Sequence, residues 1–222
     1  AVRVSDRHFG VGGDGLIVIG PSSVADFKMD IYNADGFQAE MCGNGIRCAA
    51  KYVYDKGRAK KETLTCETLA GVRTLTLGVE GGEVASVTVD MGAPRLLPED
   101  LPVLAPAGSP YIEVEVGGFS AVCVSMGNPH AVIFLDEPVD ALDLPAIGAP
   151  IERDPLFPRR TNVEFVNVLS RDRLKMRVFE RGSGETLACG TGACAAAVAA
   201  ALTGRAGRDI TMELRGGRLA IR

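Results

Sequence analysis

Two cysteines are the clearest candidates for chemistry in this chain. Cys42 and Cys189 each stand in a Cys-Gly-x-Gly sequence that runs into an apolar, alanine-containing segment. A cysteine directly before a helix faces unpaired backbone N–H groups and the positive end of the helix dipole. Both favour the thiolate, so the sequence predicts a lowered pKa for each thiol. The flanking glycines let the backbone approach a ligand closely.

The two cysteines belong to an internal repeat. Residues 29–59 and 176–206 align without a gap at an offset of 147 positions. Such self-similarity predicts a duplicated domain. Two thiols facing one cleft suit a carbon that loses a proton on one face and gains one on the other, with one thiolate as base and one thiol as acid. The helix N-termini could bind a substrate carboxylate and stabilise enediolate-like charge.

The elements that must position the thiols follow from local patterns. Strands are expected at 16–19 and 26–32, and an antiparallel meander over 62–90. A helix follows each cysteine and ends at Gly57 or Gly204. We expect the first helix to be apolar around most of its circumference, and the second, ACAAAVAAALT, to lie inside a wrap of strands. In the second half, strands are expected in the runs FSAVCVSM, GNPHAVIFLD, TNVEFVNVLS and KMRVFE.

The domain division follows from the repeat. We expect an α+β fold of two duplicated domains, each a mainly antiparallel sheet or barrel around a central helix. The expected domains are residues 1–96 and 111–222, joined by a proline-rich linker at 97–110. The repeat places a partner for residues 126–130 before residue 1, and a partner for residues 91–94 beyond residue 222. We therefore expect that the first strand of one half and the last strand of the other are missing.

Composition narrows the function classes. The chain has 222 residues, 46% hydrophobic and 23% charged, with a net charge of −4. This balance argues against a nucleic-acid or anionic-membrane surface. Neither an apolar run of about 20 residues nor a signal-peptide pattern is visible, so a cytoplasmic protein is expected. With no C-x-x-C pair and two histidines, we expect no metal site. The other cysteines are expected to fill apolar positions: Cys48, Cys66, Cys123 and Cys194.

Three other interpretations of the cysteine motifs stay open at this level. Each motif alone could be a tight turn with a buried cysteine. The two thiols could form a redox pair, although redox dithiols usually lie close in sequence. A small-molecule binding module would explain the glycines but would leave both cysteines unexplained.

The two cysteine motifs stand in the longer segments NADGFQAEMCGNGIRC (33–48) and ERGSGETLACGTGACA (180–195). With these segments, the sequence closely resembles the diaminopimelate epimerase family. Proline racemase-like enzymes share paired cysteines but lack the Glu-Arg-Gly lead-in at 180–182, and phenazine-biosynthesis isomerase-like proteins lack the cysteine pair. The family's N-terminal Gly-Asn-Asp-Phe segment has no match here. The matching motifs are DRHFGVGGDGL (6–16), NADGFQAEMCGNGIRC (33–48), MGNPHAVIFLD (126–136), TNVEF (161–165) and ERGSGETLACGTGACA (180–195).

The resemblance implies an epimerase that needs no cofactor and interconverts LL- and meso-diaminopimelate for lysine and peptidoglycan precursors. It also implies a homodimer, two acid/base cysteines (Cys42 and Cys189), and tuning of the thiols by His130 with Glu180. From local sequence alone, the asparagines before turns, the lone histidine and the strand-end glutamate would each be assigned a structural role; the resemblance favours a functional role for all of them. The substrate-binding residues that the resemblance implies are Asn33, Gly43, Asn44, Asn128, Asn162, Glu180, Arg181, Gly190 and Thr191.

Overall fold

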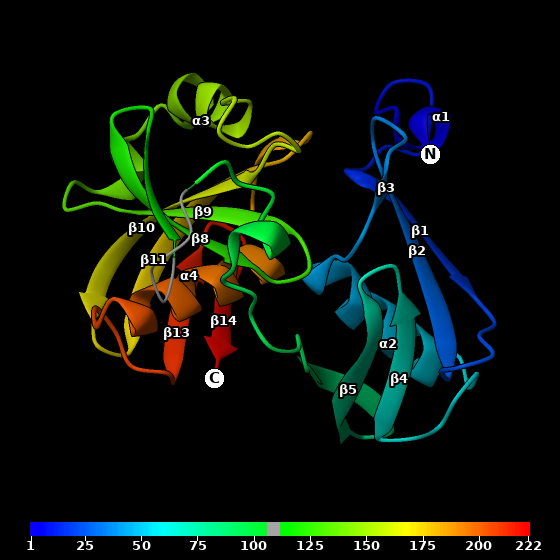
Figure 1. Cartoon of the computed structure of the whole chain (residues 1–222). Coiled ribbons are helices and arrows are strands. Elements are labelled where there is room, and N and C mark those ends of the chain that lie inside the picture. The colour runs from blue at the N-terminus through cyan, green and yellow to red at the C-terminus, as the bar shows by residue number, and fades with distance from the viewer. Residues whose placement is uncertain (106–111) are drawn as a thin grey trace. The chain divides into compact units, whose positions relative to one another are not determined.

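The computed structural model describes residues 1–105 and 112–222, and divides the chain into two compact units (Figure 1). The first unit is Ala1–Gly92 and the second is Ala93–Arg222. The expected linker begins within the second unit, because Leu101 and Val103 are buried in that unit's core. Its residues 106–110 lie outside the described residues.

The first unit is one sheet with a helix against it. The strands are β1 (Gly15–Gly20), β2 (Phe27–Asn33), β3 (Gln38–Ala39), β4 (Thr63–Thr68), β5 (Gly71–Glu80) and β6 (Glu83–Val89), with helices α1 (Val2–Ser5) and α2 (Gly43–Asp55). The sheet order is β1-β2-β4-β5-β6, and β3 pairs with β2. Strands β4, β5 and β6 form the expected antiparallel meander. The parallel pair is β2 with β4, which α2 connects.

Helix α2 is amphipathic, so the expectation of an apolar circumference was wrong. Ile46, Ala49, Ala50 and Val53 are buried in the core of the first unit, where α2 contacts β1, β5 and β6. The opposite face is exposed at Lys51 and its neighbours. Cys48 also lies on this exposed face, which corrects its assignment as apolar filling. The helix ends as expected, with Gly57 at positive φ in the C′ position.

The second unit is a larger sheet with helices on both faces. The helical elements are η1 (Pro98–Asp100), η2 (Val139–Ala141), α3 (Leu144–Glu152) and α4 (Gly190–Leu202). The strands are β7 (Ile112–Val116), β8 (Phe119–Ser125), β9 (Pro129–Phe134), β10 (Asn162–Ser170), β11 (Arg173–Glu180), β12 (Gly184–Thr186), β13 (Ile210–Leu214) and β14 (Gly217–Ile221). The order is β14-β13-β11-β10-β9-β8-β7, and β12 pairs with β11. The parallel pairs are β9 with β10 and β11 with β13.

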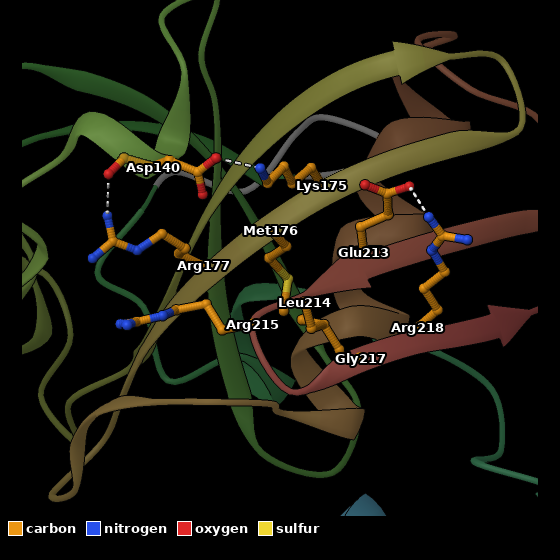
Figure 2. Close-up of a pocket in the computed structure, with 9 residues that line it drawn as sticks. All are labelled: Asp140, Lys175, Met176, Arg177, Glu213, Leu214, Arg215, Gly217 and Arg218. Atoms are coloured by element: carbon orange, nitrogen blue, oxygen red, sulfur yellow. Dashed lines mark hydrogen bonds and ion pairs between the residues drawn. The ribbon is translucent and has the colours of Figure 1, made fainter.

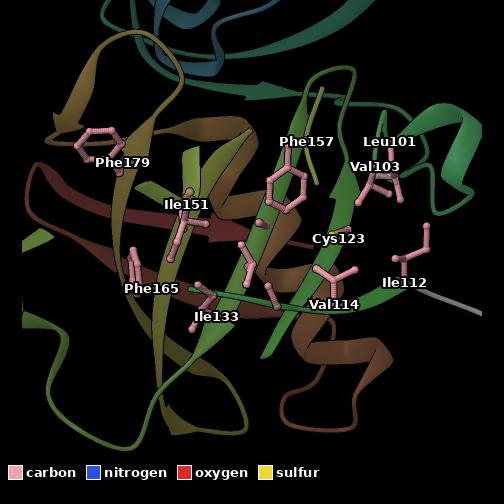
Figure 3. Close-up of a cluster of buried hydrophobic side chains, with 14 of the residues drawn as sticks. Leu101, Val103, Ile112, Val114, Cys123, Ile133, Ile151, Phe157, Phe165 and Phe179 are labelled. Atoms are coloured by element: carbon pink, nitrogen blue, oxygen red, sulfur yellow. The ribbon is translucent and has the colours of Figure 1, made fainter. Parts of the chain in front are cut away.

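Strand alternation separates two cores in the second unit. Helix α4 contacts six strands from β8 to β14, which confirms that strands wrap this alanine-rich helix (Figure 1). Helix α3 packs on the other face, against β10 and β11. On β10, Val163 and Phe165 belong to the cluster that includes Ile151 of α3 (Figure 3). Since neighbouring residues of a strand point to opposite faces, Glu164 and Val166 face α4.

The duplication is visible in the coordinates. Helices α2 and α4 begin and end at positions separated by 147 residues at both ends. The hairpins β1–β2 and β10–β11 share their register, since Ile17 pairs with Ile31 and Glu164 pairs with Val178. Most strand pairs are antiparallel in both units. The expected α+β fold of two sheet-rich, duplicated halves is therefore confirmed.

Candidate functional site

Each candidate cysteine is the N-cap residue of its helix. Cys42 has extended backbone angles, and its sulfur accepts a hydrogen bond from Gly45 N at 3.3 Å. Cys189 has nearly the same angles and accepts from Gly192 N at 3.3 Å. A thiol thus takes the place that a serine or aspartate oxygen usually holds at a helix start. Both sulfurs face the backbone donors of the first helical turn.

The second glycine of each motif leaves room for the sulfur. A methyl group on Gly45 would lie 3.4 Å from the Cys42 sulfur, and one on Gly192 would lie 3.2 Å from the Cys189 sulfur. The same methyl groups would meet a strand side chain still more closely, Ile17 in the first unit and Glu164 in the second. The Cys-Gly-x-Gly sequence therefore reflects a close approach of strand, thiol and helix start.

The pKa of Cys189 is shifted in the direction opposite to the sequence-based prediction. Burial raises the pKa of this thiol well above its ordinary value, and the nearby carboxylates of Glu180 and Glu164 raise it further. The hydrogen bonds from Thr191 and Gly192 N lower it, but by less. The prediction of a lowered pKa was wrong here, because desolvation of the thiolate outweighs the helix-end donors. Cys189 is therefore a protonated thiol at neutral pH.

Strand alternation brings polar side chains from three strands to the face that α4 covers. His130 of β9 pairs in register with Asn162 of β10, and Glu164 lies two residues further on the same face. His130 Nδ1 lies 2.7 Å from Glu164 Oε1, and both side chains are fully buried. Glu180 of β11 ends the next strand, and its carboxylate accepts a hydrogen bond from the Thr186 hydroxyl.

A continuous hydrogen-bonded path joins this strand face to the Cys189 thiol. His130 Nε2 lies 2.9 Å from Asn128 Oδ1. Asn128 Nδ2 donates to Thr191 Oγ1 at 3.2 Å, and Thr191 Oγ1 lies 3.4 Å from the Cys189 sulfur. Four residues that the sequence singled out (Asn128, His130, Thr191 and Cys189) are therefore in one network.

Asn162 ties the loop after β11 to the first residue of β9. Its Nδ2 donates to the Pro129 carbonyl at 2.8 Å, and its Oδ1 accepts from Arg181 N at 2.9 Å. The side chain is buried, with 4% of its surface exposed. The same loop is held by Glu152 of α3, whose Oε1 accepts from Gly182 N at 3.0 Å. Asn162 thus positions the backbone of Arg181.

The remaining candidates lie at the matching points of the two units. In the first unit, Asn33 ends β2, and Gly43 and Asn44 begin α2. Asn44 Oδ1 accepts a hydrogen bond from Arg47 at 2.7 Å. In the second unit, Gly190 begins α4 and Arg181 follows β11 directly. Each candidate therefore stands at a strand end or in the first turn of a helix that a cysteine caps.

Glu164 is the site residue that sequence reasoning missed. It lies inside TNVEF, a motif from which the sequence analysis took Asn162 alone. The signal was available: β10 is apolar on both sides of Glu164, and a lone carboxylate within such a strand is rarely buried unless it is paired. What sequence could not show was the partner, since His130 is 34 residues away.

A separate pocket in the second unit lies on the other side of β11. Its volume is about 360 Å³, and it is lined by charged residues of η2, β11 and the β13–β14 hairpin (Figure 2). Two pairs form among these charges, Lys175 with Asp140 and Arg218 with Glu213 at 3.5 Å. Arg215 pairs with Glu185 outside the lining, at 2.9 Å. We assign no ligand to this pocket.

Residues 1–105 and 112–222 contain neither a metal-binding cluster nor a membrane-spanning helix. No group of three histidine, cysteine, aspartate or glutamate residues there is arranged to hold a metal ion. In the same residues, no helix combines the length and apolarity needed to cross a membrane. The cysteine motifs with their surrounding polar residues are therefore the candidate site to compare with known proteins.

Comparison with known families decides the relationship. The model of the family described as "Diaminopimelate epimerase" matches residues 1–97 and 122–222. The chain belongs to the diaminopimelate epimerase family. The family member from Desulfovibrio desulfuricans is 53% identical over all of this chain and 80% of its own length. The member from Moorella thermoacetica is 55% identical, with the same two coverages.

Solved structures agree at the level of the fold. A hydroxyproline epimerase from Agrobacterium vitis matches 94% of this diaminopimelate epimerase family chain and 66% of its own, with a TM-score of 0.71 and 17% identity. A phenazine biosynthesis protein of the PhzF family from Bacillus anthracis matches 95% and 76%, with a TM-score of 0.61 and 16% identity. At these identities the likeness shows a shared fold.

Proposed function

We propose that this chain converts LL-diaminopimelate to meso-diaminopimelate without a cofactor, in the synthesis of lysine and peptidoglycan precursors. The supporting observation is a thiol at the N-cap of α2 and again at the N-cap of α4, in a chain of the diaminopimelate epimerase family. The protein is an isomerase that acts on a small molecule. We place it in the cytoplasm, where its thiols would stay reduced.

In the proposed mechanism, Cys42 and Cys189 act on opposite faces of the substrate Cα. One thiolate removes the Cα proton while the other thiol donates a proton from the far side. Burial raises the pKa of Cys189, which favours its protonated form and suits it to donate the proton. The reverse reaction needs its thiolate, which the Gly192 N–H and the Thr191 hydroxyl stabilise.

The other site residues bind and orient the substrate in this proposal. Helix starts at Gly43-Asn44 and Gly190-Thr191 offer backbone N–H groups to the reacting carboxylate, where enediolate charge develops. Five other polar side chains hold the substrate's amino group and its distal carboxylate. His130 and Glu180 tune the thiols, and the protein acts as a homodimer in this proposal. The five side chains that hold the amino and distal carboxylate groups are Asn33, Asn128, Asn162, Glu180 and Arg181.

The test uses cysteine variants with a control on each helix. Cys42→Ser and Cys189→Ser should each lower epimerisation by at least a thousandfold, because a serine hydroxyl is a far weaker acid than a thiol. Cys48→Ser on α2 and Cys194→Ser on α4 should keep activity near the wild-type value. The measurement is Cα deuterium uptake by mass spectrometry, with diaminopimelate in D₂O. If Cys42→Ser or Cys189→Ser epimerised at the wild-type rate, the two-thiol proposal would be wrong.

Parallel samples separate the rival functions. Uptake of deuterium into proline, with none into diaminopimelate, would move the protein to the racemase class. A redox protein would oxidise or reduce a test disulfide, and a binding module would bind substrate without exchanging the Cα hydrogen. The proposal requires exchange on diaminopimelate.

A further inference from the structure

Glu164 is a buried carboxylate that the fold does not need. Its counterpart in the duplicated first unit, 147 residues earlier, is Ile17. The two side chains occupy equivalent places: a methyl group on Gly192 would lie 2.5 Å from Glu164 Oε1, and one on Gly45 would lie 2.7 Å from Ile17 Cδ1. An apolar side chain therefore fills the same position in the same fold. The carboxylate is retained for another reason.

The burial of Glu164 is costly. Its side chain is fully buried, and its Oε2 has no hydrogen-bond partner among the described residues. Burying a carboxylate is unfavourable unless it is paired. Its one hydrogen-bonding partner in the described part of the chain is His130 Nδ1, at 2.7 Å. What Glu164 does must therefore be done through the imidazole.

The direction of the network follows from counting hydrogens. Asn128 points its Nδ2 at Thr191 and its Oδ1 at His130. An amide oxygen only accepts, so His130 Nε2 must carry a hydrogen. Since Thr191 Oγ1 accepts from Asn128, its own hydrogen is available to the Cys189 sulfur at 3.4 Å. Nδ1 of the same ring lies against Glu164 Oε1, so one proton is shared across that contact while the second ring hydrogen stays on Nε2.

We propose that Glu164 is a positioning residue for Cys189. Its Oε1 shares one proton with Nδ1 of His130, which fixes the other ring hydrogen on Nε2 and thereby directs the Thr191 hydroxyl onto the Cys189 sulfur. The charged and titratable groups around this network are Glu164 on β10, His130 on β9, Glu180 on β11 and Cys189 at the start of α4. The part of this inference that concerns catalysis rests on the proposed function.

Ring nitrogen NMR tests the inference without any substrate. The sequence has two histidines, so a His8→Gln variant assigns the signals of His130. In the wild-type chain, Nε2 of His130 should carry a hydrogen, donated to Asn128 Oδ1. Finding the hydrogen on Nδ1 with Nε2 unprotonated would reverse the network and overturn the proposal. This result stands whether or not the chain acts on diaminopimelate.

Kinetics test the same inference through paired variants. Glu164→Ile copies the first unit, so it should fold, and it leaves Nδ1 without a partner. It should lower kcat roughly tenfold to a hundredfold, the loss expected for one hydrogen bond to a thiolate, with little change in KM. Glu164→Gln can donate from its amide to Nδ1 and should restore most of the rate. Wild-type kcat in Glu164→Ile would overturn the proposal.

A double-mutant cycle separates positioning from general destabilisation. Thr191→Val removes the hydroxyl that the network delivers, so adding Glu164→Ile should lower kcat little further. The matched control is Glu152→Gln, which alters another buried carboxylate of the same unit, and its effect should multiply with that of Thr191→Val. Multiplicative effects of Glu164→Ile and Thr191→Val would show that Glu164 does not act through Thr191.

Discussion

Gly192→Ala should disturb the second unit far more than Gly45→Ala disturbs the first. These glycines are equivalent, each in the first turn of a helix capped by a cysteine. The methyl group added at Gly192 would meet Glu164 Oε1 at 2.5 Å, and the one added at Gly45 would meet Ile17 Cδ1 at 2.7 Å. The distances are similar, but the neighbours are not. Ile17 is half-buried and its terminal methyl can rotate away, whereas Glu164 is fully buried and bonded to His130.

The magnitude follows from what has to move. Displacing Glu164 strains a filled interior by about 1–3 kcal/mol and weakens a buried charged hydrogen bond worth about 1.5–3 kcal/mol. Alanine's higher helix propensity returns about 0.5–1 kcal/mol. Gly192→Ala should therefore lower the free energy of unfolding of the second unit by about 2–5 kcal/mol. For Gly45→Ala, rotation of Ile17 and the propensity gain should leave a net change within about 1 kcal/mol.

Urea unfolding of both variants against the wild type measures the difference, and ring NMR of His130 shows whether its Glu164 partner has moved. The two units are followed separately by hydrogen exchange in α2 and α4, since a chain of two units need not unfold in one step. Equal destabilisation by the two substitutions would refute the reasoning, as would Gly192→Ala with an unchanged His130 signal.

Two further predictions concern stability and pH. Burial raises the pKa of Cys66 to about 12. The folded state therefore keeps the Cys66 proton at pH values where the unfolded chain has already lost it. Between pH 8 and 10 the free energy of unfolding of the wild type should fall by about 1.5–2 kcal/mol more than that of Cys66→Ala. Denaturant unfolding of the first unit at both pH values checks this prediction. An equal loss of stability in the wild type and in Cys66→Ala would contradict it. Arg177 donates to the carbonyls of Val139 and Leu142 at 2.8 Å and pairs with Glu185 at 2.8 Å. Arg177→Met should lower the stability of the second unit by about 2–4 kcal/mol at pH 7. Arg177 is also the main cause that lowers the pKa of the Glu185 carboxyl, and such stability is present above the unfolded pKa and lost as pH falls. Unfolding at pH 7 and pH 4 should therefore show a smaller acid loss in Arg177→Met, and an equal or larger loss would contradict this assignment.

The sequence was sufficient for features that repeat or that depend on local backbone chemistry. The offset of 147 residues predicted two equivalent helices, and α2 and α4 match it at both ends. Gly57 and Gly204 end these helices at positive φ, as glycine at C′ does. The alanine run of α4 predicted a wrap of strands because such a helix has no polar face to expose.

Features set by distant contacts could not be predicted. Helix α3 contains Gly148 and Pro150, and it forms because Asp143 caps it and Gly148 packs closely on Phe179. The raised pKa of Cys189 comes from burial and from carboxylates on β10 and β11, which no reading of the Cys-Gly-Thr-Gly motif contains.

The most direct test of the two-thiol account is the hydrogen isotope at Cα in the first product formed in D₂O. Purified LL-diaminopimelate is incubated with the chain, the reaction is stopped at low conversion, and substrate and product are separated for mass spectrometry. If one thiol removes the proton and the other donates from the opposite face, the first meso product should carry deuterium at Cα while the remaining substrate keeps protium. A first product that keeps protium at Cα would mean that one group serves both faces, and would contradict the account.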